Sequence, residues 1–211
     1  MTKDVSEFYD VFAEEYAQLF FDELDKKPFD RSILLRFAEM TKDLGTVCDI
    51  GCGTGHIGSF LKQNGVEIAG IDISGQMVNE AKRLSPHIHF EQGDMFSLRF
   101  GDGYFAGIVA FYSIVHLSLT EVDLAFLEFK RLIHSGGYLL ISFHLGDETI
   151  KVDKCKDDKI ASAVYVLFDP DEIINKIKKV GFLIEEAIIR YPYEDAEYPS
   201  KRAYILARKL Q

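Results

Sequence analysis

The chain has 211 residues, a length that suits one domain with a sizeable buried core. Apolar residues make up 47% and charged residues 27%, as in ordinary globular proteins, and no apolar run approaches the roughly 18 residues of a membrane span. The net charge of −10 and the weakness of basic clusters such as that around Lys176 disfavour DNA or RNA as a partner, although a local patch stays open.

The three cysteines, Cys48, Cys52 and Cys155, form no Cys-x-x-Cys or Cys/His spacing of the kind that binds zinc. We therefore expect no metal and unpaired thiols in a reducing compartment. The first four residues, Met1 to Asp4, do not match a signal peptide. A cytoplasmic protein, monomeric or homodimeric, is the expectation.

The first 45 residues have a helical pattern. Apolar side chains recur at spacings of three and four between Phe8 and Phe20, and Pro28 marks a break before a second helix over residues 29–40. Tyr9 and Tyr16 are seven residues apart, so we expect them to share one helix face.

Strands and helices then alternate. We expect strands at 46–50, 66–71, 88–91, 105–111 and 138–143, and helices at 57–63, about 74–84 and about 120–132. Ser74 can cap the second of these helices, and Thr120 with Asp123 forms a capping-box-like start for the third. Such alternation predicts a parallel sheet with helices on both faces.

The end of the chain has a different pattern. The segment from Gly146 to Ala161 is polar and rich in lysine and aspartate, so we expect an exposed loop or a mobile lid. Asp169 and Pro170 begin a helix that ends at Gly181. Residues 182–191 and 202–208 are then two strands without an intervening helix, which should pair antiparallel.

A glycine-rich turn follows the first expected strand. Gly51, Gly53 and Gly55 lie between Ile50 and a helix that begins near His56. Glycine permits positive φ and close approach of a ligand to the backbone. The helix N-terminus offers free amides, and open parallel sheets bind ligands at the carboxyl ends of their strands. The turn is therefore a predicted ligand site.

The spacing of the glycines leaves the ligand open. A dinucleotide turn has the pattern G-x-G-x-x-G, which fails from Gly51 because His56 takes the third glycine's place. The pattern matches from Gly53 to Gly58, but it then begins three residues beyond the strand. A nicotinamide-dependent oxidoreductase therefore stays an alternative.

Two aspartates follow the next two strands. Asp72 could accept hydrogen bonds from both hydroxyls of a ribose, or it could cap the following turn. Asp94 could accept a hydrogen bond from an adenine amino group, or it could be an ordinary turn aspartate.

The three segments Asp49–Gly55, Gly70–Ser74 and Gln92–Met95 together resemble the class I S-adenosyl-L-methionine-dependent methyltransferases. The stretch from Phe8 to Tyr16 also resembles small-molecule members of that family. The resemblance implies an α/β fold: a Rossmann-like, doubly wound sheet of seven mostly parallel strands with the last strand antiparallel. It divides a single domain, 1–211, into an N-terminal helical cap (1–45), a cofactor-binding core (46–145) and a C-terminal lid with antiparallel strands (146–211).

The resemblance also implies the ligands and their residues. The cofactor would be S-adenosyl-L-methionine, the product S-adenosyl-L-homocysteine, and the partner a small-molecule methyl acceptor. Asp49 and the turn would hold the methionine end, Asp72 the ribose, and Asp94 the adenine region. The implied cofactor-binding set is Tyr9, Tyr16, Asp49, Gly51, Cys52, Gly53, Gly55, Asp72, Ile73, Met77, Asp94, Met95 and Phe111.

The acceptor side is less defined. His116 follows the fourth strand close to the expected methyl position, so His116 and Tyr112 are the catalytic candidates, with His144 as a further histidine at a strand end. The aromatic and charged cluster from Arg190 to Tyr204 could line the acceptor pocket or tie the last two strands together.

Two nucleic-acid signatures are absent, Asn/Asp-Pro-Pro-Tyr and Pro-Cys. A small-molecule acceptor is therefore favoured, without a choice among O, N, S and C methylation. A non-catalytic cofactor-binding module is the remaining alternative.

Overall fold

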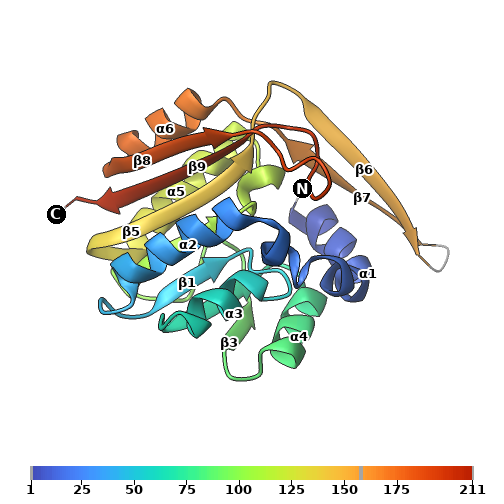
Figure 1. Cartoon of the computed structure of the whole chain (residues 1–211), viewed down its shortest axis with the longest axis horizontal. Helices are drawn as coiled ribbons and strands as arrows, with labels where there is room; N and C mark the ends of the chain where they lie inside the picture. Colours follow the sequence, from blue (N-terminus) through green and yellow to red (C-terminus); the bar gives the residue numbers. More distant parts are fainter. Residues whose placement is uncertain (1, 157–158, 211) are drawn as a thin grey trace.

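The computed structural model describes residues 2–156 and 159–210. Its main feature is a seven-stranded sheet in the order β3-β2-β1-β4-β5-β9-β8 (Figure 1). The strands are β1 (Val47–Ile50), β2 (Ile68–Asp72), β3 (His89–Gln92), β4 (Phe105–Phe111), β5 (Ile133–His144), β8 (Phe182–Arg190) and β9 (Arg202–Lys209). Strands β1 to β5 pair in parallel, and β9 is antiparallel to both of its neighbours. The predicted sheet and its antiparallel last strand are confirmed.

Helices cover both faces of this sheet (Figure 1). They are α1 (Thr2–Phe20), α2 (Pro28–Thr41), α3 (His56–Gln63), α4 (Gly75–Leu84), α5 (Leu119–Leu132) and α6 (Pro170–Lys179), with short 3-10 turns η1 (Glu23–Lys26) and η2 (Ile114–His116). Apolar side chains of α5 and α6 form one core layer, and those of α2, α3 and α4 form the other. All seven residues of β4 are buried, as expected for a central strand between two such layers.

The start of α5 differs from the predicted one. Ser118, not Thr120, is the N-cap: its hydroxyl accepts a hydrogen bond from the Glu121 amide, and the Glu121 carboxylate accepts one from the Ser118 amide. Ser118 and Glu121 have the same spacing as the predicted pair, Thr120 and Asp123. Ser118 and Glu121 form the capping box because α5 begins at Leu119.

Strand β5 also begins earlier than predicted. The strand was expected over 138–143, but Ser135-Gly136-Gly137 also lies inside it, as an irregularity at which the pairing with β4 shifts. Gly136 has a φ of +82°, which glycine adopts without strain.

The expectation of a loop between Gly146 and Ala161 is wrong for residues 149–156 and 159–161, and residues 157–158 lie outside the described part of the chain. Strands β6 (Thr149–Lys156) and β7 (Lys159–Val166) form an antiparallel hairpin outside the main sheet. Figure 1 shows this hairpin reaching beside α1. Ala161 and Ala163 of β7 pack against Phe8 and Phe12 of α1, so the polar residues of the segment belong to a two-stranded ribbon with a single buried face.

Within residues 2–156 and 159–210, no helix has the length and apolar character needed to cross a membrane.

Candidate active site

A cavity opens at the carboxyl ends of β1, β2 and β4, beneath α1. Its empty volume is about 1100 Å³, the part open to solvent included. Fourteen of the residues proposed from sequence line it: Tyr9, Tyr16, Asp49, Gly51, Cys52, Gly53, Asp72, Ile73, Met77, Asp94, Met95, Phe111, Tyr112 and His116. The structure therefore brings together side chains from five separate segments of the chain.

Gly55 is the one proposed residue that does not line the cavity. It has a φ of +81° and caps α3, and a Cβ there would lie 2.7 Å from the Phe90 ring. Gly51 is different, because it lines the cavity and a Cβ on it would collide with Ser113 after β4. Gly55 thus serves packing, and Gly51 serves the close approach of two turns at the cavity floor.

Asp72 links the first two turns. Its Oδ2 accepts a hydrogen bond from the Gly53 amide and its Oδ1 one from the Ser74 amide, both at 2.8 Å. Burial raises the pKa of Asp72 to about 6, although both amide hydrogen bonds favour the charged form. The carboxylate therefore both caps the turn after β2 and forms part of the cavity wall.

Asp49 and Asp94 occupy the neighbouring strand ends. Asp49 Oδ2 accepts from the Gly58 amide at 3.1 Å, and burial raises the pKa of this carboxyl to about 7. Asp94 Oδ1 accepts from the Phe96 amide at 3.1 Å, which fixes the turn after β3.

Helix α1 covers the cavity. Tyr9 and Tyr16 share its inner face, as predicted, with ring centroids 5.9 Å apart. Asp10 Oδ1 accepts hydrogen bonds from the Ser74 hydroxyl at 2.6 Å and the Gln76 amide at 3.1 Å. These contacts attach α1 to the turn after β2 and to the first turn of α4.

His116 lies on η2 with both ring nitrogens in hydrogen bonds. Nδ1 is 2.8 Å from the carbonyl oxygen of Val164 in β7, and Nε2 is 2.8 Å from Tyr9 Oη. The Tyr165 hydroxyl is 3.2 Å from that of Tyr9. Burial lowers the pKa of His116 below its ordinary value, so the ring is neutral near pH 7.

An ion pair that the sequence analysis missed borders the cavity. Glu23 accepts from His56 Nε2 at 3.1 Å and from Lys27 Nζ at 2.6 Å. Burial opposes the charged form of Glu23, but these two partners outweigh it and lower its pKa to about 2. His56 Nδ1 is buried without a partner, a sign that a polar ligand group fits there. The position of His56 at the start of α3 was the only signal available.

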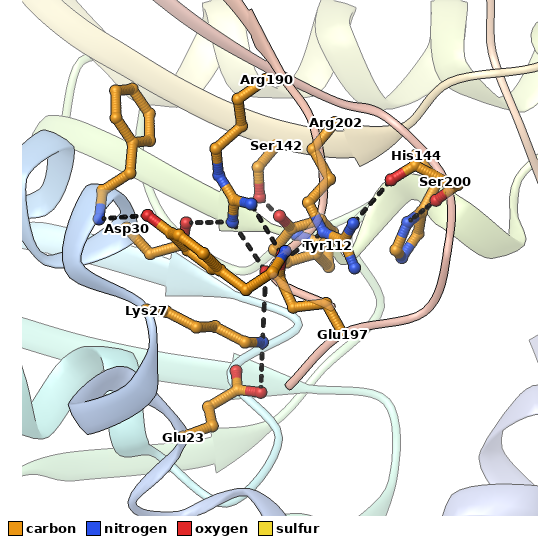
Figure 2. A network of polar contacts seen from close by, with 12 residues as sticks. Glu23, Lys27, Asp30, Tyr112, Ser142, His144, Arg190, Glu197, Ser200 and Arg202 are labelled. Atoms are coloured by element: carbon orange, nitrogen blue, oxygen red, sulfur yellow. Dashed lines mark hydrogen bonds and ion pairs between the residues drawn. The ribbon is translucent and has the colours of Figure 1, made fainter. Parts of the chain in front are cut away.

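Beside the cavity lies a buried polar network (Figure 2). Arg190 donates to both oxygens of Glu197 at 2.6 and 2.7 Å and to Asp30 at 2.7 Å. The Tyr204 hydroxyl donates to Asp30 at 2.6 Å and lies 2.8 Å from the Tyr112 hydroxyl. The cluster near the C-terminus therefore ties β8, β9 and α2 together, and none of its members from Arg190 onward lines the cavity.

This network reaches the cavity at Tyr112 and, through Lys27, at Glu23. Tyr112 is the only non-glycine residue with positive φ, +54°, in the described part of the chain. Such strain is held in place by surrounding contacts and is common at functional sites. His144, the other histidine at a strand end, instead lies 2.8 Å from the Ser200 hydroxyl and outside the cavity lining.

The charge of the cavity wall is one-sided. Five carboxylates line it, those of Glu23, Asp49, Asp72, Asp94 and Glu121, and no lysine or arginine of the described residues does. Its potential is therefore negative and favours a cationic ligand. No group of three or more His, Cys, Asp or Glu side chains within 2–156 and 159–210 could hold a metal ion.

Comparison with known proteins shows similarity to methyltransferases. The family model described as a methyltransferase domain matches residues 47–137. The chain is 29% identical to the O-methyltransferase cnsE of Penicillium expansum, over 65% of this chain and 52% of that protein. It is 31% identical to a dTDP-3-amino-3,4,6-trideoxy-alpha-D-glucopyranose N,N-dimethyltransferase of Streptomyces venezuelae, over 48% of this chain and 43% of that protein. The chain thus spans about half the length of these curated relatives.

A solved structure matches over nearly the whole chain. The DhpI–SAH complex superposes with a TM-score of 0.75 at 20% identity, covering 99% of this chain and 97% of that one. This likeness shows the fold, and the sequence match over 47–137 covers the glycine turn and both aspartates. The chain is thus similar in sequence to methyltransferases over residues 47–137, and its whole fold is that of the matched solved structure.

Proposed function

We propose that this protein transfers a methyl group from S-adenosyl-L-methionine to a small-molecule acceptor. The observation that carries the proposal is the cavity wall of five carboxylates without lysine or arginine. Such a wall suits a sulfonium cation and repels the pyrophosphate of a dinucleotide. The Gly53 amide, which could bind a phosphate, donates instead to Asp72. Both features count against a nicotinamide cofactor.

The lining residues match the parts of this cofactor. Asp72 with Ile73 and Met77 would hold the ribose and nucleoside, and Asp94 with Met95 the adenine region. The glycine turn, Cys52, Asp49 and the Glu23–His56 pair would hold the amino-acid end. Because Nε2–H donates to Glu23, the unpartnered Nδ1 of the neutral His56 ring can accept a hydrogen bond from the ammonium group.

Other lining residues cover the reacting centre. Tyr9 and Tyr16 cover the site from α1, and Phe111 borders it from β4. When bound, the cofactor supplies a methyl group already activated by the sulfonium charge. Since the reagent is activated, the protein's part is to position the partners and exclude water.

The acceptor side lies at Tyr112 and His116, which we propose as the residues next to the reacting centre. Of the two relatives named above, one is an O-methyltransferase and the other an N,N-dimethyltransferase of a dTDP-linked amino sugar, and this sugar substrate supports a small-molecule acceptor here. We also propose that the whole chain is one domain and that it acts in the cytoplasm as a monomer or homodimer. Nucleic acid is disfavoured as its methyl acceptor. The free thiols of Cys48, Cys52 and Cys155 support that location.

Titration calorimetry with S-adenosyl-L-homocysteine tests the cofactor assignment. We expect saturable binding, and a loss of about 1–3 kcal/mol in Asp72→Ala because a hydrogen-bonding carboxylate is removed. The exposed Asp147→Ala is the matched control and should bind like the wild type. Absence of binding at millimolar ligand, or tight binding of NADH instead, would contradict the proposal.

A further inference from the structure

The tautomer of His116 is set by the backbone of the hairpin. A carbonyl oxygen only accepts hydrogen bonds, so Nδ1, 2.8 Å from the Val164 oxygen, must carry the ring proton. In the neutral ring Nε2 is then left with its lone pair. That lone pair faces Tyr9 Oη at 2.8 Å, so the Tyr9 hydroxyl donates to it.

Tyr9 connects this nitrogen with the cavity. Its hydroxyl can accept a hydrogen bond from Tyr165 at 3.2 Å while it donates to His116, and one acceptor position remains. Tyr9 and His116 both line the cavity, so a hydroxyl group of an acceptor can donate to that position. Burial raises the pKa of Tyr9 well above its ordinary value, which keeps its proton in place until a transfer occurs.

The rings that contact this pair are aromatic, and the Asp72 carboxylate acts on Tyr9 from the cavity wall. The His116 ring contacts Tyr165 of β7 with centroids 4.5 Å apart and Tyr9 of α1 at 5.5 Å. Tyr16 completes the face at 5.9 Å from Tyr9. Aromatic rings pack well on such faces, and the carboxylate-lined wall repels an anionic acceptor. An uncharged ring compound fits best.

Proton affinity selects the kind of hydroxyl. Imidazole has a reference pKa of about 6.5 and a tyrosine-like phenol one of about 10. An aliphatic hydroxyl lies near water, at about 15.7. Burial lowers the pKa of His116 and widens both gaps, but the gap to an aliphatic alcohol still exceeds that to a phenol by about 6 pKa units.

We propose that Tyr9 and His116 form a proton relay for an acceptor with an aromatic hydroxyl group, so that the reaction is O-methylation of a phenol; this rests on the methyl transfer proposed above. The acceptor oxygen bonds to the methyl carbon as the carbon–sulfur bond breaks, with its electron pair kept by sulfur. The phenolic proton passes to Tyr9 Oη while the Tyr9 proton passes to His116 Nε2. His116 leaves this step as a cation and returns its proton to solvent after product release.

The test uses phenol and 4-nitrophenol as acceptors with radiolabelled S-adenosyl-L-methionine, between pH 6 and 9. In His116→Asn and Tyr9→Phe we expect kcat/KM for phenol to fall by about 10²–10⁴, the usual contribution of a general base. In the same variants kcat/KM for 4-nitrophenol should fall by less than about tenfold, because its more acidic hydroxyl ionises unaided. This loss should become smaller as pH rises. His134→Asn and the exposed Tyr104→Phe, outside the cavity lining, are matched controls and should behave as the wild type.

Each contrary outcome has a distinct meaning. If both variants lose activity equally on the two phenols, the residues are structural and the relay is overturned. If the wild type methylates neither phenol, or methylates aniline or thiophenol in preference, the acceptor class is overturned. Binding of S-adenosyl-L-homocysteine is measured first on every variant, because the proposed function predicts this binding with or without a relay. Absence of binding counts against the proposed function, and binding without the expected losses of kcat/KM counts against the relay.

Discussion

Removing the charge of Glu197 should destabilise the protein strongly. Its side chain has no exposed surface and accepts hydrogen bonds from Arg190, at 2.6 and 2.7 Å, and from the Tyr193 amide at 2.8 Å. Arg202 Nε lies 3.2 Å from the same carboxylate. In Glu197→Gln the side-chain NH2 group would face these donors, and two buried guanidinium groups would lose their shared counter-charge (Figure 2).

The magnitude follows from the burial of these groups. Removing one partner of a buried ion pair costs about 3–5 kcal/mol, because the remaining charge is left desolvated. At about 2–4 °C per kcal/mol for a protein of this size, Tm should fall by about 6–20 °C. Burial opposes the charge on Glu197, but Arg190 and the Tyr193 amide prevail and lower its pKa. Its contribution is therefore present above pH of about 4.3 and is lost as pH falls through the folded-state pKa.

Thermal unfolding followed by circular dichroism, at pH 7 and at pH 4, measures the effect. The exposed Glu194→Gln lies in the same segment and serves as the control, with an expected change within about 0.5 kcal/mol. The difference between wild type and Glu197→Gln should narrow at the lower pH. A loss of unfolding free energy below about 1 kcal/mol at pH 7 would refute the reasoning, since exposed ion pairs on a protein surface contribute that little.

Two further results are expected. The affinity for S-adenosyl-L-methionine should fall as pH drops from 8 to 6, because Asp49 and Asp72, with pKa values of about 7 and 6, become neutral and attract the cation less. The same raised pKa values have the opposite pH dependence for the stability of the free protein against unfolding. Their stabilising contribution is complete below about pH 3.9 and is lost as pH rises through 6 and 7. Calorimetry across pH measures the binding, and a flat profile would contradict the charge argument. Gly55→Ala should destabilise more than Gly65→Ala in urea unfolding, although both have positive φ (+81° and +87°), because only at Gly55 does the new methyl group meet Phe90. We expect about 1–2 kcal/mol at Gly65 from the backbone alone, and equal losses would argue against the packing role.

The sheet and the cofactor side of the cavity could be predicted because their signals are local. Asp49 lies in β1, Asp72 ends β2 and Asp94 comes just after β3, and parallel strands bring such ends to one edge. The three segments that carried the resemblance therefore meet in one cavity without any knowledge of long-range contacts. The central position of β4 followed in the same way from its uninterrupted apolar run.

The remaining features depend on contacts between distant segments. Glu23 meets His56 across 33 positions, and His116 meets the Val164 backbone across 48, and neither pairing leaves a spacing pattern. The hairpin was not predicted because charged residues on its outer face obscure the alternation of buried and exposed positions along its two strands. Alternation is weak evidence when the buried face consists of small residues such as Ala161 and Ala163.

The hairpin constrains His116 through a main-chain oxygen, not through the side chain of Val164. Any residue at that position presents the same carbonyl, so the orientation of the imidazole depends on the path of β7 and tolerates substitution there. Side chains on the inner face of β7, such as Tyr165, which contacts the His116 ring from outside the cavity lining, can then vary while the proton position on His116 stays fixed. Exchange of single side chains on β7 should accordingly change the packing around Tyr9 and His116 while the main-chain oxygen keeps the ring proton on Nδ1, so that the packing of this pair and its protonation can be engineered separately.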